Sequence, residues 1–209
     1  MLKSFDLMGL FAECSSFPDK IGHIRPLVAV FGSARLGNET QTYQQAHELA
    51  SQLSRQGISI LTGGGPGIME AANRGARGGR GRSLGLCIHL PFEEGRNVYV
   101  EPDLSLEFKH FAARKIAFFS HADAFVVFAG GFGTLDELFE TWMLMQTGHM
   151  HPKPIFLIGK SFWTPLLAWM NDTLVETKTI AREDMDSVKV TDSLEEVYEI
   201  LMAILHLPR

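Results

Sequence analysis

The sequence is poor in several features that would define a specialised class of protein. Its only cysteines are Cys14 and Cys87, too few for a disulfide framework and not at the C-x-x-C spacing of a zinc or redox site. Basic residues are not in excess, since 19 lysines and arginines stand against 24 aspartates and glutamates. The formal net charge of −5 gives no general attraction for nucleic acid. An anionic ligand must therefore be bound by local features.

The amino-terminal segment lacks a long apolar run. Lys3, Asp6, Gly9 and Glu13 interrupt it, so it has neither the h-region of a signal peptide nor the length of a membrane span. We therefore expect a cytoplasmic protein without a membrane partner. Hydrophobic residues make up 45% of the chain, which is enough for a sizeable core.

Short apolar runs alternate with segments of helical pattern along the chain. Runs that are apolar on both faces and separated by helices are typical of a parallel sheet covered on each side. We predict an α/β fold, a Rossmann-like three-layer α/β/α sandwich with a parallel sheet. Residues 1–25 are expected to form an arm or short helix, and residues 26–209 a single nucleotide-binding domain. The predicted strands are 27–31, 58–61, 83–90, 124–128 and 155–158, and the predicted helices are 43–56, 68–76, 104–120, 135–147, 163–175 and 194–205.

Three predicted strands run into glycine-containing turns, at residues 31–35, 62–67 and 129–134. In a parallel sheet these turns share the carboxyl edge, where open α/β folds bind their ligands. Glycine lets the backbone approach a ligand closely, and the helix that follows offers unpaired N–H groups to an anion. The turns therefore predict a phosphate-bearing small molecule. The candidate binding residues are Gly32, Ser33, Gly64, Gly65, Gly130, Gly131, Gly133 and Thr134.

The turns do not match the motifs of larger nucleotides. None has the G-x-G-x-x-G fingerprint followed by an acidic residue about 20 positions later, which disfavours NAD. Gly159-Lys160-Ser161 imitates the end of a P-loop, but Pro154 stands where that motif needs its first glycine. A single phosphate, as in a nucleoside 5′-monophosphate, remains. The basic stretch 75–82 is interpreted as a mobile loop, with a phosphate contact as the alternative.

Glu137 and Arg114 are the candidate chemical groups. Thr134-x-x-Glu137 has the spacing of a capping box, which also occurs at Ser193-x-x-Glu196 without a glycine turn. Its position one helical turn from a phosphate site favours a functional role for Glu137. Arg114 and Lys115 fall at or inside an apolar arc of their predicted helix, where a cation is costly without a partner. A structural ion pair and a ligand contact are both consistent with that placement.

Two further features have structural interpretations. His149 and His151 form the only close histidine pair, in a predicted loop without a carboxylate or cysteine at ligand spacing, so we expect no metal site. The apolar stretch 142–145 exceeds what a surface helix needs, which fits either core packing or a dimer contact.

The motifs together resemble a known family. The segment Thr62-Gly-Gly-Gly-Pro-Gly-Ile-Met-Glu-Ala-Ala-Asn-Arg-Gly-Ala76, the pair Arg114-Lys115 and the segment Gly130-Gly-Phe-Gly-Thr-Leu-Asp-Glu137 occur in this order. This pattern is similar to the Lonely Guy (LOG) family of cytokinin riboside 5′-monophosphate phosphoribohydrolases, often labelled "lysine decarboxylase". The form of the first segment looks more like the family's largely bacterial branch.

The resemblance implies residue roles and an activity. It implies that Arg114 and Glu137 are catalytic, that Lys115 and the 130–134 turn bind nucleotide, and that Glu70 is a pocket residue. The family's signature proline is Ala129 here. The implied reaction cleaves the N-glycosidic bond of a nucleoside 5′-monophosphate, AMP-like or a cytokinin riboside, giving free base and ribose 5-phosphate. It implies a homodimer or larger homo-oligomer, with no metal and no cofactor.

The same features bear on three other functions. The decarboxylase label is rejected, because a pyridoxal-phosphate enzyme needs a Schiff-base lysine among cofactor-holding groups and no such constellation is visible. A non-catalytic nucleotide- or molybdenum-cofactor-type binding protein stays open as the alternative, since the fold and the turns serve binders too. The acidic net charge weighs against a single-strand DNA binder.

Overall fold

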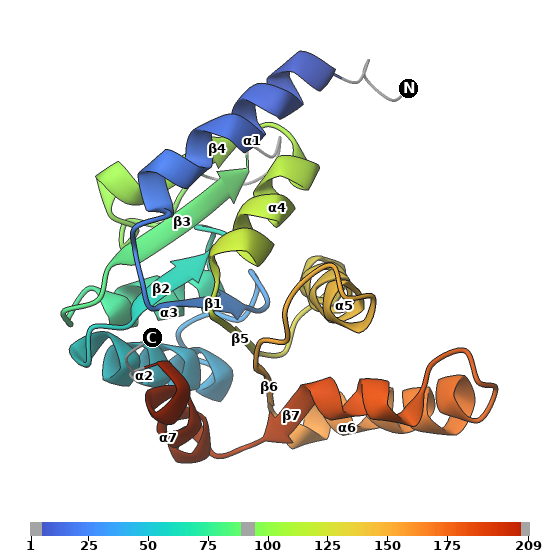
Figure 1. Ribbon diagram of the computed structural model, residues 1–209. Helices are drawn as coiled ribbons and strands as arrows, with labels where there is room; N and C mark the ends of the chain where they lie inside the picture. Colours follow the sequence, from blue (N-terminus) through green and yellow to red (C-terminus); the bar gives the residue numbers. More distant parts are fainter. Residues whose placement is uncertain (1–5, 89–94, 206–209) are drawn as a thin grey trace.

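The computed structural model of the protein describes residues 6–88 and 95–205. Within these ranges, one seven-stranded sheet has the order β4-β3-β2-β1-β5-β6-β7, and every neighbouring pair is parallel. Helices lie on both sides of it (Figure 1), which confirms the predicted Rossmann-like α/β fold. The strands are β1 (Leu27–Phe31), β2 (Ser59–Thr62), β3 (Ser83–Ile88), β4 (Ser105–Phe108), β5 (Ala124–Val127), β6 (Ile155–Ile158) and β7 (Val188–Thr191).

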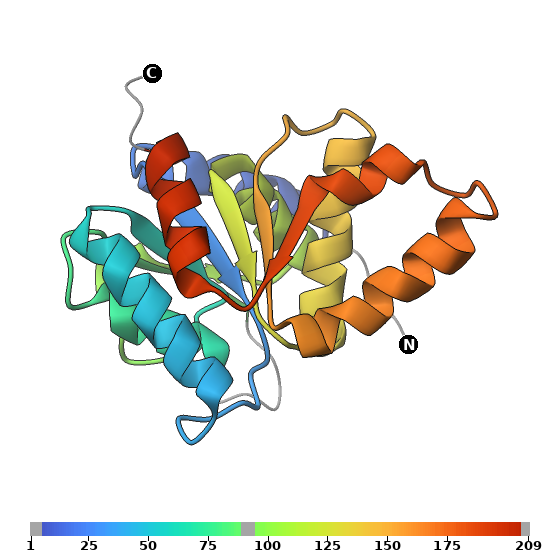
Figure 2. The same cartoon turned by 90° about the horizontal axis from the view of Figure 1, so that it is seen from below.

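The helices divide between the two faces of the sheet, as Figure 2 shows from a second direction. One core cluster takes its helical residues from α2 (Gln41–Arg55), α3 (Ile68–Ala76) and α7 (Leu194–Leu205). The opposite cluster joins the other four helices, together with the segments that follow the last of them. These helices are α1 (Leu7–Ile21), α4 (Phe111–His121), α5 (Phe132–Gln146) and α6 (Lys160–Trp169).

The central strands are buried on both faces, as their continuous apolar sequence predicts. In β1, Ala29 and Phe31 belong to one core cluster, whereas Val28 and Val30 belong to the other. Successive side chains of a strand point to opposite faces, so a strand with a helical layer on each side needs apolar residues at every position. The helical layers on both faces of the sheet therefore account for the continuous apolar sequence of the central strands.

The edges of the sheet differ from the prediction. The predicted helix 104–120 is wrong at its start, because Pro102–Leu104 forms a 3-10 turn, Ser105–Phe108 forms β4, and α4 begins only at Phe111. In β4 the buried Leu106 and Phe108 flank the exposed Glu107, which is the alternation of a strand with one solvated face. The predicted helix 163–175 begins earlier, at Lys160, and turns into a π-helix over Met170–Val175.

Strand β7 is absent from the predicted strands, because its half-exposed residues and Lys189 break the apolar pattern of a buried strand. The predicted strand 83–90 ends at Ile88 in the structure, and residues 89–90 lie outside the described residues.

The amino-terminal arm contains a helix that packs onto the domain. Asp6 caps α1 by accepting a hydrogen bond from the backbone N–H of Gly9 at 2.9 Å. Phe17 and Ile21 are buried in the core cluster shared with α4. Glu13 accepts hydrogen bonds from the backbone N–H groups of residues 109 and 110, immediately before α4. Residues 1–5 lie outside the described residues.

The strand order reverses between β1 and β5. The chain runs outward from β1 through β2, β3 and β4 on one side, and from β5 through β6 and β7 on the other. The two central connections therefore leave the carboxyl edge in opposite directions and open a crevice between them, which is where doubly wound folds bind ligands. Within the described ranges, no helix has the length and apolar character needed to cross a bilayer.

Candidate active site

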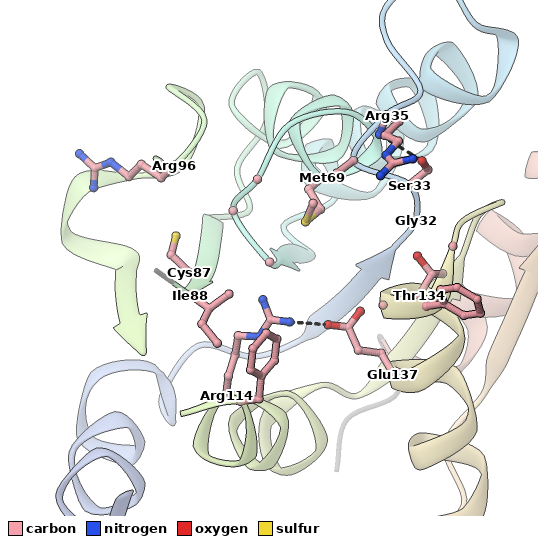
Figure 3. Close-up of a pocket in the computed structure, with 18 of the residues that line it drawn as sticks. Gly32, Ser33, Arg35, Met69, Cys87, Ile88, Arg96, Arg114, Thr134 and Glu137 are labelled. Carbon is pink, nitrogen blue, oxygen red and sulfur yellow. Dashed lines mark hydrogen bonds and ion pairs between the residues drawn. The ribbon is translucent and has the colours of Figure 1, made fainter. Parts of the chain in front are cut away.

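A cavity of about 720 Å³ opens at this switch point, and all three predicted glycine turns contribute to its lining (Figure 3). Its volume lies in the usual range for small-molecule sites. The turns after β1, β2 and β5 meet here because the three strands are neighbours in the sheet. Of the residues selected from sequence, those in the lining are Gly32, Ser33, Gly64, Gly65, Arg114, Gly131, Gly133, Thr134 and Glu137.

The turns are hydrogen-bonded to one another. The backbone N–H of Ser33 donates to the carbonyl oxygen of Ala129 at 3.0 Å, and the N–H of Ile68 donates to the carbonyl of Ser33 at 3.0 Å. A Cβ atom on Gly32 would collide with Ile68, and one on Gly67 would collide with the backbone of the first turn. Glycine is thus required at these two positions by the packing of the turns, before any ligand is considered.

The third turn leads directly into the amino terminus of α5. The helix starts at Phe132 with Gly131 as its N-cap, and no side chain caps it. Its first N–H groups have no acceptor within the helix, and they carry the positive end of the helix dipole. A Cβ atom on Gly131 or Gly133 would meet nothing within 4 Å. This end of α5 therefore has the free donors and the open space that an anionic group needs.

The structural alternative for Thr134 and Glu137, a capping box at the start of α5, is not what the structure shows. Because α5 begins at Phe132, both residues lie inside the helix, and the buried Thr134 packs against Gly130. The equivalent pattern at the start of α7 does form a cap, in which Ser193 Oγ accepts from the N–H of Glu196 at 3.1 Å. The two copies of one sequence pattern thus serve different purposes.

Glu137 and Arg114 form an ion pair in the cavity. Arg114 Nη2 donates to Glu137 Oε1 at 3.0 Å, and the two side chains are 12% and 13% exposed. Figure 3 shows them pointing toward each other from α4 and α5. The guanidinium also lies near the rings of Phe111 and Phe118, with its centre 5.3 and 6.0 Å from their centroids. Arg114 Nε is buried and has no hydrogen-bond partner in the described structure.

Burial dominates the chemistry of Glu137. It raises the pKa of this carboxyl from 4.5 to about 7, against the opposing effect of the Arg114 charge. A carboxyl that exchanges its proton near neutral pH suits general acid–base work or the stabilisation of a developing positive charge. The cavity thus contains a carboxyl group that titrates near neutral pH, paired with a guanidinium cation.

Sequence reasoning missed part of the lining. The described lining residues include three arginines, Arg35, Arg96 and Arg114, and two glutamates, Glu107 and Glu137. Arg35 lies inside the first predicted turn but was not selected. Further lining residues come from α3, β3, β4, α4 and the segment before β4, where no motif marks them: Met69, Cys87, Ile88, Gly95, Arg96, Glu107 and Phe111.

Three selected residues lie beside the cavity and not in its lining. Lys115 pairs with Asp136 at 2.7 Å and with Glu140 at 2.6 Å, between α4 and α5. Burial opposes the charged form, but these pairs raise the pKa of Lys115. Glu70 Oε1 accepts from the hydroxyl of Tyr43 at 2.9 Å. Gly130 is covered by the side chain at position 134.

Other sequence features lie elsewhere. In the basic stretch 75–82, Arg82 pairs with Glu101 and Asp103 at the start of β3, the end opposite the cavity. The P-loop lookalike begins α6, where the N–H of Lys160 donates to the carboxylate of Asp192 at 2.8 Å, so an acid occupies the place of a phosphate.

No group of three or more potential metal ligands occurs in the described residues. Trp142 is buried and donates to a backbone carbonyl at 2.8 Å.

Fold and site define a doubly wound α/β protein with a cavity at its switch point, where glycine turns and the amino terminus of α5 meet. Residues 69–201 match a family model described as "Possible lysine decarboxylase". The chain is 30% identical over 152 residues to cytokinin riboside 5′-monophosphate phosphoribohydrolase LOG2 of Arabidopsis thaliana, covering 71% of this chain and 70% of that protein. It is 28% identical over 176 residues to the Mycobacterium tuberculosis phosphoribohydrolase, covering 81% and 89%. The chain belongs to the LOG family.

Solved structures agree on the fold. The X-ray structure of TM1055 superposes with a TM-score of 0.63 at 25% identity, covering 85% of this chain and 99% of that one. The molybdenum cofactor carrier protein of Chlamydomonas reinhardtii superposes with a TM-score of 0.65 at 21% identity, covering 87% and 99%. The description "lysine decarboxylase" finds no counterpart in the cavity, because no lysine is among its described lining residues.

Proposed function

We propose that the protein hydrolyses the N-glycosidic bond of a nucleoside 5′-monophosphate, AMP or a cytokinin riboside monophosphate, to free base and ribose 5-phosphate. The observation that carries this proposal is the Arg114–Glu137 pair in a cavity lined by the three glycine turns. The names of the relatives from Arabidopsis and Mycobacterium support the same reaction.

The proposed substrate lies with its phosphate at the amino terminus of α5. The free N–H groups of the 131–134 turn and Ser33 of the first turn line the cavity together there. The backbone N–H of Ser33 is hydrogen-bonded to the carbonyl oxygen of Ala129. Glu137 lies one helical turn further along α5, so the ribose attached to that phosphate is within its reach. Binding energy at the phosphate then positions the glycosidic bond over the carboxyl group.

In the proposed reaction, a water oxygen bonds to C1′ of the ribose while the C1′–N bond breaks. The electron pair of that bond leaves with the base nitrogen, which takes up a proton, and the attacking water loses one. The sugar passes through an oxocarbenium-like state that a nearby carboxylate stabilises. Glu137 supplies this charge and exchanges the proton. Arg114 balances the carboxylate in the free protein and steadies the phosphate or the departing base in the complex.

The test is incubation of the purified protein with AMP, followed by chromatography for adenine and ribose 5-phosphate. We expect both products in equal amounts, and no products from Glu137→Gln. Glu140→Gln is the matched control, since Glu140 lies on the same helix, pairs with Lys115 and does not line the cavity. Tight AMP binding without product release would contradict the proposed hydrolysis and would favour a non-catalytic nucleotide- or molybdenum-cofactor-type carrier. A panel of other monophosphates then defines the preferred base.

The proposal includes a homodimer. Helices α4 and α5 carry large apolar side chains that are well exposed in the single chain: Phe111, Ile116, Phe132, Phe139 and Met143. Phe132 is 92% exposed and lines the cavity, so a second copy seated on this face would lie at the cavity mouth. Light scattering after gel filtration should give twice the chain mass for the wild type and a lower mass for Phe139→Asp. A monomeric wild type would contradict this part of the proposal.

A further inference from the structure

Asn97 lies beside the cavity, and its hydrogen bonds hold the second glycine turn. Its Nδ2 donates to the carbonyl oxygens of Gly64 at 3.0 Å and Gly65 at 2.9 Å. Its backbone N–H donates to the carbonyl of Gly64 at 2.7 Å. Its Oδ1 accepts from the N–H of Tyr99 at 3.1 Å, which fixes the side-chain amide in one orientation. The segment before β4 is thus hydrogen-bonded to the turn after β2.

A buried polar network supports Asn97 from behind. The side chain of Asn73 is fully buried; its Oδ1 lies 3.0 Å from Asn97 Nδ2 and accepts a hydrogen bond from Thr62 Oγ1 at 2.6 Å. Its Nδ2 donates to Ser83 Oγ at 3.0 Å and to a backbone carbonyl of β3. Thr62 Oγ1 in turn accepts from the N–H of Gly64 at 2.9 Å. A fully satisfied buried network of this kind fixes one geometry.

The turn needs this external support because of its composition. Gly64 and Gly67 have φ values of +74° and +68°, a region that favours glycine. Glycine has more conformational freedom in the absence of restraint than any other residue, so a turn built from it is costly to order. The carbonyl groups of Gly64 and Gly65 both accept hydrogen bonds from Asn97.

We infer that Asn97 is a positioning residue that holds the Gly64–Gly65 turn in the shape that receives the nucleotide. The inference rests on the proposed function and deepens it. Asn97 itself is not part of the cavity lining, whereas its neighbour Arg96 and the two glycines are. A turn that is already ordered costs nothing to order on binding. Since that saving is equal for substrate and transition state, it acts on KM and not on kcat.

The experiment compares Asn97→Ala and Asn97→Asp with the wild type. The aspartate has the same shape and keeps the acceptor for Tyr99, but it sets an oxygen against the carbonyls of Gly64 and Gly65. We expect KM for AMP to rise about tenfold or more in both variants, with kcat within about threefold of wild type. Hydrogen exchange should accelerate at residues 63–68 and stay unchanged in β1 and β5. Asn171→Ala is the control, because Asn171 is also hydrogen-bonded but lies near α6.

The outcomes separate this inference from the proposed function. Unchanged exchange at residues 63–68 in Asn97→Ala would overturn the inference, as would faster exchange with unchanged affinity for AMP. A wild type that binds AMP without releasing adenine would overturn the proposed reaction only, and the equilibrium dissociation constants of AMP for wild type and Asn97→Ala would then decide the inference. A wild type that neither cleaves nor binds AMP would overturn both.

Discussion

The burial of Glu137 predicts an unusual pH dependence of stability. Its carboxyl keeps its proton in the folded protein up to about pH 7, whereas the ordinary pKa is 4.5. Between these values the folded protein binds more protons than the unfolded chain, so a rise in pH favours unfolding. The contribution of this group to the free energy of unfolding is therefore greatest below pH 4.5 and is lost as the pH passes through 7. Most carboxyl groups act in the opposite direction.

The magnitude follows from the size of the shift. The pKa rises from 4.5 to about 7, and each unit corresponds to about 1.4 kcal/mol. The expected loss of stability is therefore about 3 kcal/mol between pH 4.5 and pH 8. Glu137→Gln removes the titrating group and leaves an amide of similar shape. The free energy of unfolding of wild type minus that of Glu137→Gln should fall by this amount over the interval.

Denaturant unfolding at several pH values and one protein concentration measures this difference. Because both proteins carry every other titrating group, their common pH dependence cancels. The constant cost of leaving Arg114 opposite an amide affects the absolute difference but not its slope with pH. Two results would refute the reasoning: a difference that stays flat, which would mean that the Arg114 charge cancels the effect of burial, and one that rises with pH, which would mean that it outweighs burial.

Further predictions concern the cavity and the amino-terminal helix. Gly133→Ala should fold normally, since a Cβ atom there meets nothing within 4 Å, but should weaken AMP binding about tenfold or more in calorimetry. Gly78→Ala, where a Cβ atom comes no closer than 4.0 Å to the carbonyl oxygen of Gly75, should leave AMP binding unchanged. Arg114→Met should lower kcat/KM for AMP about a hundredfold and move the acidic limb of the pH–rate profile upward, because it removes the charge that lowers the pKa of Glu137. An unmoved limb would contradict their coupling. Phe17→Ala should cost about 3 kcal/mol of unfolding free energy in denaturant titration, and a loss below 1 kcal/mol would mean that α1 packs loosely.

The centre of the sheet and the glycine turns could be predicted from sequence because their signals are local. The strands at 27–31 and 155–158 are apolar at every position, and the structure has them at the predicted bounds. The turn at 129–134 combines glycine with the end of such a strand, so its place at the carboxyl edge follows from the parallel sheet. Both inferences needed only neighbouring residues and the fold class.

The rest depends on contacts between distant residues. The sequence of β4 has too few positions to distinguish a period of two from a helical pattern, and its pairing with β3 decides the outcome. Cys87 reaches the cavity because β3 lies beside β2, and Arg96 reaches it because the next residue, Asn97, is hydrogen-bonded to the turn after β2. Asn97 carries no motif at all, since the two glycine carbonyl groups that it binds are more than thirty positions away in the sequence.

Helix α1 does not line the cavity, but its contacts influence the position of a cavity residue. Glu13 holds the two residues that precede α4, and Arg114 lies on the first turn of that helix. Helix α1 therefore helps to set the orientation of α4. That orientation in turn affects how closely the guanidinium approaches Glu137. Catalytic strength in relatives should then vary with the packing of this leading helix even where every cavity residue is identical.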